Sequence, residues 1–348
     1  MTDVAVVGAG IVGLATAYAL RRRGATVTVY ERGVPGNGQS GGESRIFRHL
    51  HDDPRLIALA VEARDAWRRW EAELGRELLV ADGVLAIGPA APRRLALLRE
   101  AGLRARAADA GELPLLDAPG RDAILDEDGG VIRARAAVEA LGDALRDATV
   151  ADEVIAVRRT GELRAGGVVA RYERVVVCAG RATPALARGT GLALPVRQSA
   201  HVRLTFRVRG EPPARLPCLL DSEAGAYGDP LPGNAVYAVG LGETPAHEDG
   251  GVLEPAELAA EGERIVAYVR ERLPGLDPEP LEARHCWVTE LPWSHDGIAV
   301  WERDALLAPA GNNLFKHAPV LGDLLARAAL GEELDPRLRT VARLGYVA

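Results

Sequence analysis

The sequence predicts an α/β protein in two parts, one built on a parallel β-sheet and a smaller one, of α+β type, built on a mixed sheet. Three observations support this prediction. Within residues 3–31 the chain opens with a strand, a glycine-rich turn, a helix and a second strand, which together make a βαβ unit. Apolar runs typical of buried parallel strands recur later, whereas residues 200–292 carry strand-like runs with prolines at the turns. A length of 348 residues is enough for two domains.

Hydrophobic periodicity predicts each element in turn. Residues 3–7 form an apolar run typical of a buried strand, and apolar side chains then recur at helical spacing until Gly24 ends the helix. Residues 26–30 predict the second strand, and the polar, glycine-rich residues 32–53 predict a long loop. The other predicted elements are helices at 54–74, 133–146, about 255–273 and 319–330 and strands at about 81–88, 150–157, 164–170, 174–178 and 305–308.

The parallel-strand patterns lie at both ends and in the middle of the chain, so one domain is assembled from discontinuous segments. We expect this larger domain to contain residues 1–83, 130–199 and 293–348. The smaller domain, which would bind the substrate, contains residues 84–129 and 200–292.

A dinucleotide fingerprint follows the first strand. Residues 8–13 read Gly-Ala-Gly-Ile-Val-Gly, in which one glycine permits the tight turn, one lets the backbone approach a pyrophosphate and one allows close packing of helix on strand. The helix N-terminus then presents free N–H groups to the phosphates. Glu31 ends the second strand 18 residues after Gly13, where its carboxylate can accept both ribose hydroxyls. The fingerprint fits NAD and FAD equally; Glu31 argues against NADP, and the neighbouring Arg32 weakens that argument.

Composition excludes several classes of protein. A formal net charge of −7 without a basic cluster argues against nucleic acid as a partner. No apolar run approaches the ~18 residues of a transmembrane helix, so we expect no membrane span, and the chain enters a strand at once, which leaves no room for a signal peptide. Three scattered cysteines are too few for a disulfide framework or a cysteine-based metal site, and no metal is expected. These observations predict a cytoplasmic protein.

The basic residues are unusual, because of the 42 lysine and arginine residues only Lys316 is a lysine. Replacement of lysine by arginine on this scale is typical of a coding bias toward GC-rich codons. Such a bias acts wherever a surface position needs only a positive charge. A lysine that survives such drift is expected where a compact ammonium is needed and a planar guanidinium does not fit. Survival by chance is the alternative.

Together these motifs resemble the FAD-dependent D-amino-acid oxidase superfamily, in particular the branch of monomeric sarcosine oxidase and N-methyltryptophan oxidase. The resemblance is strongest over residues 1–50 and 285–330 and weak over 84–130 and 200–280. It implies an FAD-binding Rossmann domain of the glutathione-reductase type and a mixed-sheet substrate domain. The segments that carry it, besides the fingerprint with Glu31, are Ser-Arg-Ile-Phe-Arg-His at 44–49, Val-Val-Val-Cys-Ala-Gly at 175–180, His-Cys-Trp-Val-Thr at 285–289 and Leu-Phe-Lys at 314–316.

The resemblance also implies a reaction: oxidation of the C–N bond of a secondary or cyclic amine, or an amino acid, that carries a carboxylate. A hydride would pass to the flavin, and the imine product would hydrolyse or rearrange. Arg45 would stabilise the negative charge of the reduced flavin, while Arg48 and Lys316 would hold the substrate carboxylate. Tyr227 matches a substrate-side tyrosine, and His49 could help to position the amine.

Cys286 matches the position at which related enzymes carry their flavin as a thioether, so the resemblance implies covalent FAD, with an unreacted, buried thiol as the alternative. The full set of residues expected to bind the cofactor comes from all four segments and the strands between them. It comprises Gly8, Gly10, Ile11, Val12, Gly13, Glu31, Arg32, Ser44, Arg45, Val154, Ala179, Gly180, Cys286, Gly311, Asn313, Leu314 and Lys316.

Two departures from the family pattern stand out. Leu314 occupies a position where glycine is usual, so we expect a different loop path or flavin contact there. Related enzymes use a second lysine to accelerate reaction with O2. In this sequence the position that best matches that lysine is occupied by Ala238. Either an arginine or histidine substitutes, or reoxidation by O2 is slow, or another electron acceptor is used.

Two other classes of function remain open. An NAD-dependent dehydrogenase would share the opening fingerprint, although it has no reason to carry the motifs at 44–49 and 312–316. A flavin-binding protein without amine oxidase activity would share the fold. A monomer is expected in each case.

Overall fold

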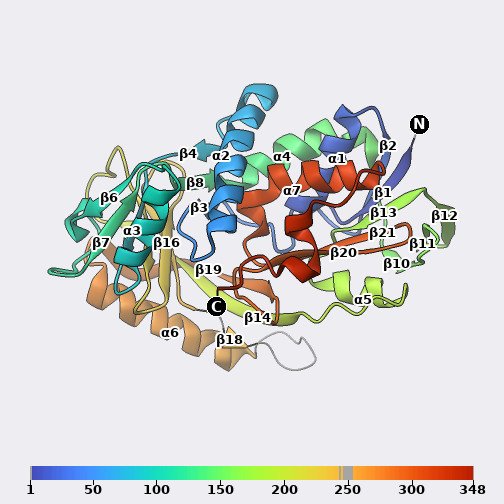
Figure 1. The fold of residues 1–348 in the computed structure, drawn as a ribbon. Helices are drawn as coiled ribbons and strands as arrows, with labels where there is room; N and C mark the ends of the chain where they lie inside the picture. Colours follow the sequence, from blue (N-terminus) through green and yellow to red (C-terminus); the bar gives the residue numbers. More distant parts are fainter. Residues whose placement is uncertain (1, 243, 246–253, 348) are drawn as a thin grey trace.

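The computed structural model describes residues 2–242, 244–245 and 254–347, and within these ranges the chain forms two large sheets and two small ones, which confirms the α/β prediction. In Figure 1 the two large sheets form the two ends of an elongated molecule. The first large sheet is parallel except for the antiparallel pair at its β20 edge. Its strands, in spatial order, are β20 (Ile298–Arg303), β21 (Leu306–Gly311), β13 (Arg174–Val177), β1 (Asp3–Val7), β2 (Thr26–Glu31) and β9 (Thr149–Ala151).

Both faces of this first sheet are covered. Val4 and Val6 of β1 pack with helices, whereas Ala5 and Val7 face a small antiparallel sheet. This arrangement explains why β1 is apolar along its length instead of alternating. The helices are α1 (Ile11–Arg22), α2 (Pro54–Leu74), α4 (Ala134–Ala144) and α7 (Leu314–Ala329), and the small sheet is β10 (Val154–Val157), β11 (Glu162–Ala165) and β12 (Val168–Arg171), with α5 (Thr183–Arg188) beside it.

Helices α1 and α7 pack closely because Gly322 lies at their crossing. A Cβ on Gly322 would lie 2.5 Å from the carbonyl carbon of Ala15, whereas one on Gly142 of α4 would meet no atom within 4 Å. We therefore expect Gly322→Ala to destabilise the protein by about 1–3 kcal/mol through overpacking, and Gly142→Ala to stabilise it by about 0.5–1 kcal/mol. Thermal unfolding of the two variants checks this prediction, which is wrong if both shift Tm in the same direction.

The second large sheet is mixed, as predicted, because its β15–β5 pair is parallel and its other pairs are antiparallel. Helix α6 (Pro255–Arg272) packs on it through Ile265, Tyr268 and Val269 (Figure 1). The strands, in order, are β18 (Thr244–Pro245), β14 (Arg197–Val208), β17 (Val236–Gly240), β16 (Ala226–Pro230), β15 (Cys218–Asp221), β5 (Val84–Ile87), β7 (Ala123–Asp126) and β6 (Ala105–Ala108), with β19 (Leu276–Glu290) paired to β14. Apart from the start of β14, these strands fall in the residues that we assign to the substrate domain; the domain boundaries themselves stay a prediction.

Several predicted boundaries were wrong. Residues 150–157 belong to two strands in different sheets, β9 and β10, and residues 164–170 span the turn between β11 and β12. The segment 32–53 is not a continuous loop, because β3 (Ser44–Phe47) pairs with β8 (Gly130–Arg133), which also pairs with β4 (Leu79–Val80). Helix α7 begins at Leu314 and not at 319, because Asn313 adopts a left-handed conformation (φ 57°) that starts the helix, and Pro319 lies inside it. Lys316 therefore lies in the first turn of a helix.

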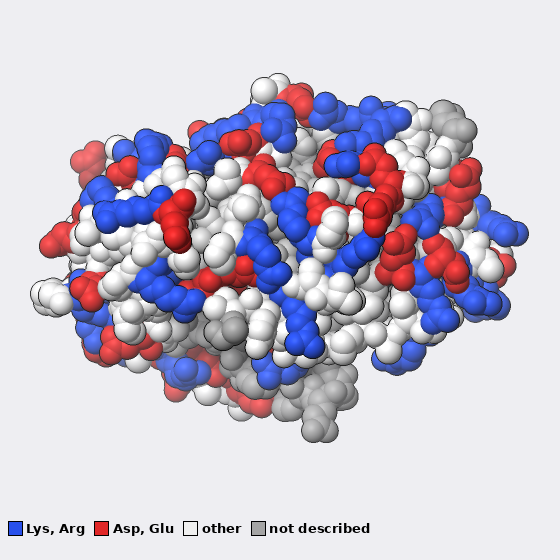
Figure 2. Space-filling model, in the orientation of Figure 1, with Lys and Arg blue, Asp and Glu red and all other residues white. Residues whose placement is uncertain are grey.

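The remaining elements are short or peripheral. Across the described residues, each helix is too short or too polar to cross a lipid bilayer. Figure 2 shows acidic and basic side chains intermingled over the visible face. The remaining helices are α3 (Ala91–Glu100) and the 3₁₀ turns Ala110–Glu112, Arg146–Ala148, Gly180–Ala182, Pro336–Leu338 and Thr340–Ala342.

Candidate active site

A cavity of about 1040 Å³ is lined by residues of both large sheets. On the parallel sheet it lies at the carboxyl ends of β1, β2 and β13, where ligands of open α/β sheets bind. The predicted site residues that line it are Gly8, Gly10, Ile11, Val12, Glu31, Arg32, Arg45, Arg48, Val154, Ala179, Gly180, Tyr227, Cys286, Gly311, Asn313, Leu314 and Lys316. Gly13, Ser44 and His49 are absent from this lining.

The glycine-rich turn has the geometry of a phosphate cradle. Gly8 has a φ of +100°, and a Cβ there would lie 2.5 Å from the carbonyl oxygen of Cys178. Gly13 lies behind the turn, where a Cβ would come within 1.9 Å of the Gly8 oxygen, so its role is close packing and not lining. The first N–H of α1, on Ile11, donates to the hydroxyl of Ser40 (2.9 Å). The backbone of Gly8 and Gly10 lines the cavity, where a bound pyrophosphate would approach it.

Glu31 is fixed at the same end of the cavity. One of its carboxylate oxygens accepts the N–H of Ala9 and the other accepts the N–H of Gly33, both at 2.8 Å. The carboxylate therefore ties β2 to the glycine-rich turn and still lines the cavity. Arg32 is exposed and pairs with Glu153 (3.0 Å), so its charge is directed to that carboxylate.

Arg45 is held at the centre of the cavity by backbone carbonyls. Its guanidinium donates to the carbonyl oxygens of Ser44 (2.7 Å), Gln39 (3.2 Å) and Gly41, and lies 5.6 Å from the ring centroid of Phe315. Burial, and then the nearby charge of Arg203, lower its pKa. Such a fixed guanidinium can stabilise an anion in the cavity.

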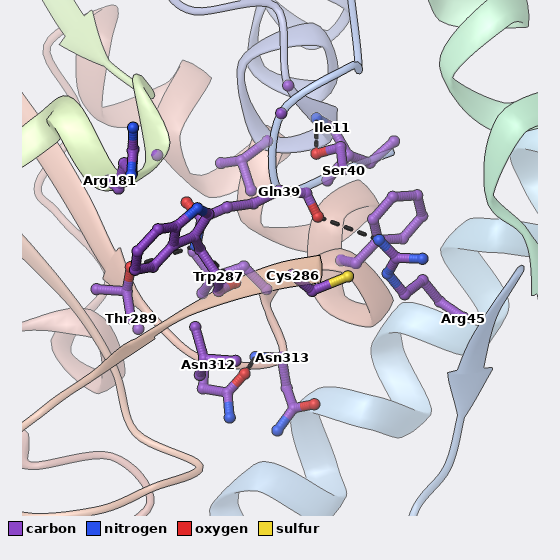
Figure 3. Close-up of a pocket in the computed structure, with 18 of the residues that line it drawn as sticks. Ile11, Gln39, Ser40, Arg45, Arg181, Cys286, Trp287, Thr289, Asn312 and Asn313 are labelled. Atoms are coloured by element: carbon purple, nitrogen blue, oxygen red, sulfur yellow. Dashed lines mark hydrogen bonds between the residues drawn. The ribbon is translucent and has the colours of Figure 1, made fainter. Parts of the chain in front are cut away.

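Cys286 lies beside Arg45. It is a half-buried free thiol on β19, opposite His201 on β14, and in Figure 3 its sulfur points toward Arg45. On its other side Trp287 stacks under the guanidinium of Arg181, 4.7 Å from the ring centroid. This cation–π pair could not be expected from the sequence, because nothing in the local pattern of Trp287 distinguishes it from a core aromatic residue.

Lys316 projects from α7 into the cavity. Its side chain is buried, at 2% exposure, and among the described residues its ammonium has no hydrogen-bond partner. Burial, and then the charge of Arg48, hold its pKa well below the ordinary range. Arg48 also lines the cavity, and its Nη2 lies 3.1 Å from each carboxylate oxygen of Asp296 while Nη1 donates to the carbonyl of Leu50.

The mixed sheet contributes a second polar cluster. Arg203 of β14 is buried and contacts Asp229 of β16 (3.3 Å) and the hydroxyl of Ser44 (3.1 Å), so Ser44 supports a lining residue without lining the cavity itself. His201 and Tyr227 line the cavity beside this pair. Burial lowers the pKa of His201 to about 3, which makes its imidazole neutral. The resemblance is weakest in this region, and the sequence analysis missed both Arg203 and Asp229.

His49 was wrongly expected in the site. It is fully buried, its backbone N–H donates to Asp126 (2.8 Å), and its ring Nδ1 lies 3.1 Å from the same carboxylate. Its side chain packs against Phe47 instead of reaching the cavity. Two histidines, His247 and His295, have the polar surroundings of surface loops in the sequence. His295 is indeed exposed, at the cavity edge, and pairs with Glu290 (2.7 Å), while His247 lies outside the described residues.

Metal ligands are not grouped in the part of the chain that the structure describes, where no set of three or more histidine, cysteine, aspartate and glutamate side chains could hold an ion. The glycine cradle, together with the ammonium of Lys316 that finds no partner in the described part of the chain, instead fits a bound dinucleotide and an anionic ligand. Gly8 and Gly10 line the cavity with backbone alone, and the buried ammonium of Lys316 faces it; a dinucleotide and an anion would supply the missing partners.

Comparison with known proteins extends these observations. The family described as DAO, FAD dependent oxidoreductase, matches residues 3–328. Three solved structures share the fold. NikD, described as an unusual amino acid oxidase essential for nikkomycin biosynthesis, has a TM-score of 0.85 in its open form, at 21% identity over 99% of this chain and 97% of that chain. Glycine oxidase from Geobacillus kaustophilus gives 0.79, at 21% identity over 96% of each chain. Iminodiacetate oxidase from Chelativorans sp. BNC1 gives 0.75, at 20% identity over 97% of this chain and 98% of that chain.

One curated protein shares a short segment with the chain. Over 59 residues it is 48% identical to the tRNA 5-methylaminomethyl-2-thiouridine biosynthesis bifunctional protein MnmC of Magnetococcus marinus (strain ATCC BAA-1437 / JCM 17883 / MC-1). The match covers 17% of this chain and 8% of that protein, so the chain spans a small part of this relative.

Proposed function

We propose, because this chain belongs to the DAO family of FAD-dependent oxidoreductases, that it oxidises the C–N bond of an amine or amino acid that carries a carboxylate. The observation that carries the proposal is the buried ammonium of Lys316, which lies beside Arg48 in the cavity and has no hydrogen-bond partner among the described residues. The names of three proteins with the same fold describe oxidases of amino acids, glycine and iminodiacetate. Each of these compounds joins an amine to a carboxylate. The substrate of this chain would be a secondary or cyclic amine of the same kind.

We assign the cofactor end of the cavity to the dinucleotide. The backbone at Gly8 and Gly10 would hold the pyrophosphate, Glu31 would accept the ribose hydroxyls, and Arg45 would stabilise negative charge on the flavin. FAD supplies, when bound, the acceptor of a hydride. Leu314 and Asn313 would border the ring from the start of α7.

At the other end, Lys316 and Arg48 would bind the substrate carboxylate and so orient the C–H bond that breaks. Tyr227 would border the substrate from the mixed sheet. The substrate amine has to lose its proton before oxidation, because a protonated nitrogen cannot support the developing positive charge. The imine product would then hydrolyse or rearrange.

Purification and anaerobic titration test this proposal. The protein should be yellow, and an N-substituted or cyclic amino acid should bleach its visible spectrum in the absence of O2. A colourless protein that binds NAD would favour an NAD-dependent dehydrogenase instead. A yellow protein that no amine bleaches would favour a flavin-binding protein without amine oxidase activity.

We propose further that Cys286 carries the FAD covalently. Its thiol is half-buried and faces the cavity near Arg45, whereas burial raises the pKa of Cys178, which also lines the cavity, to about 12 and so suppresses its thiolate. Acid precipitation should leave the yellow colour with the wild-type protein and with Cys178→Ala, and should release it from Cys286→Ala. Colour that leaves the wild-type protein would contradict covalent attachment.

The electron acceptor is O2 or another oxidant, and we expect O2 to react slowly. Ala238, where a lysine would stand, is fully buried and pairs in register with Asp229, whose carboxylate contacts Arg203 (3.3 Å). Arg203 is thus the buried cation near Ala238, but Asp229 neutralises much of its charge. Mixing the reduced protein with aerated buffer, and separately with an artificial acceptor, measures the two rates. We also propose a monomer, and a cytoplasmic location, since none of the three cysteines forms a disulfide, as is typical of a reducing compartment.

A further inference from the structure

Three cationic side chains meet at the α7 end of the cavity, and two of them already have a carboxylate partner in the protein. Nη2 of Arg48 lies 3.1 Å from both oxygens of Asp296, and Arg94 pairs with Asp52 at 3.0 Å. Lys316 is the cation whose ammonium has no hydrogen-bond partner among the described residues. The internal carboxylates therefore balance the two arginines and leave a single positive charge for a ligand.

Asp296 is built into this cluster and is not a loosely placed surface acid. Its carboxylate also contacts Nδ1 of His51 (3.0 Å) and accepts the side-chain amide of Asn313, and its backbone N–H donates to the hydroxyl of Ser294 (3.2 Å). Although burial opposes ionisation, Arg48 and then His51 hold the pKa of Asp296 well below its ordinary range. These two neighbours therefore favour the carboxylate form of Asp296.

This pairing limits what Arg48 can offer. Asp296 engages Nη2 and the Leu50 carbonyl engages Nη1, so part of the donor capacity of the guanidinium is already used and its charge is balanced by a carboxylate of the protein. A carboxylate that reaches Lys316 meets an ammonium that has no hydrogen-bond partner among the described residues. A second carboxylate at the same place would meet an arginine whose charge is already balanced, and would lie close to Asp296.

We propose that Asp296 limits this end of the cavity to one substrate carboxylate, by neutralising Arg48 and holding it in place. The inference rests on the proposed function, since it assigns the same end of the cavity to the substrate. It makes Asp296 a positioning and specificity residue: amines with one carboxylate here are accepted, and compounds with two adjacent carboxylates are disfavoured.

Calorimetric titration of the holoprotein with propionate and malonate tests this inference without any turnover. The two ligands have the same carbon skeleton length, and malonate carries two ionised carboxylates at pH 8. Asp296→Asn keeps an oxygen that can accept from Arg48 but removes the charge. The ratio of the two dissociation constants should move by about tenfold in favour of malonate, the effect of one additional charge-assisted hydrogen bond. Asp296→Glu should keep the wild-type preference.

Asp323→Asn is the matched control, because Asp323 is an exposed carboxylate on α7, the helix of Lys316, and pairs with Arg23. It removes the same charge and should leave the ratio unchanged. The inference would be overturned if Asp296→Asn changed the dissociation constants of both ligands by the same factor, or if the ratio moved against malonate. So would wild-type protein that binds malonate tenfold more tightly than propionate, a measurement that does not depend on the variant folding. Failure of the proposed function is separate, since it would be seen as a flavin that no amine bleaches.

Discussion

Lys316→Met is expected to weaken the binding of a carboxylate ligand about 100-fold, while the protein keeps its FAD. The ammonium is buried, faces the cavity and has no internal partner among the described residues, so a ligand carboxylate supplies its compensation. Loss of a hydrogen bond between two charged groups at a buried site costs about 1.5–3 kcal/mol, or 10- to 150-fold in affinity. Arg48 makes up only a small part of the loss, because Asp296 balances its charge. Titration of wild type and variant with propionate measures the effect.

The same substitution should not damage the fold. Methionine has a similar length, and replacing a buried ammonium that lacks a partner by a thioether removes a desolvation cost. We therefore expect an unchanged or higher Tm for Lys316→Met. The control is Arg327→Met, on the exposed side of α7, where Arg327 pairs with Glu332 (2.7 Å). Its propionate affinity should match that of the wild type; an unchanged affinity in Lys316→Met would remove Lys316 from the site.

The parts of the fold and site that follow from local sequence were predicted well. The glycines of the first turn, Glu31 and the strands around them obey rules of spacing, and the structure brings them to one end of the cavity. The family resemblance drawn from the same motifs was confirmed by a match over residues 3–328. Lys316 could be identified from composition because a lysine-poor chain makes its one lysine conspicuous.

What the sequence could not predict depends on partners far apart in the chain. Arg48 and Asp296 are separated by 248 positions, and no local pattern distinguishes Asp296 from the other acidic residues. Arg203 and Asp229 meet across two strands, in the region where the family resemblance is weakest. A lining residue and a core residue differ there only by which face of the strand they occupy.

Two errors have the opposite cause, since a local pattern was trusted against tertiary contacts. Pro319 is typical of a helix start, yet α7 begins five residues earlier because Asn313 takes the left-handed conformation. The indole of Trp67 donates to the Lys316 carbonyl (2.8 Å), which anchors this added turn to α2. His49 stands one residue after Arg48 and was expected beside it, but its side chain is buried against Asp126.

Ligand binding should depend on pH through Lys316, and the sign follows from its environment. Burial and then Arg48 hold the pKa of Lys316 well below 10.5 in the free protein, so the ammonium loses its proton as pH rises through that lowered pKa. Only the protonated form attracts a carboxylate, so Kd for propionate should rise about tenfold per pH unit above that point. A bound carboxylate raises the pKa again, so binding is accompanied by proton uptake. Calorimetry in two buffers of different ionisation enthalpy measures that uptake, and Lys316→Met should show none.

Flavin reduction should have the opposite dependence at lower pH, because the substrate amine must be neutral. The value of kcat/KM is therefore expected to rise with pH through the amine pKa and to fall again through that of Lys316.

The stability of the protein provides a check on the lowered pKa of Lys316 that needs no ligand. Between the lowered pKa and about 10.5, the unfolded chain holds a proton on Lys316 that the folded chain does not, so the stability of the wild type should rise with pH relative to Lys316→Met. A difference in Tm between the two proteins that stays constant across this window would contradict the lowered pKa, and with it the alkaline limb of the profile.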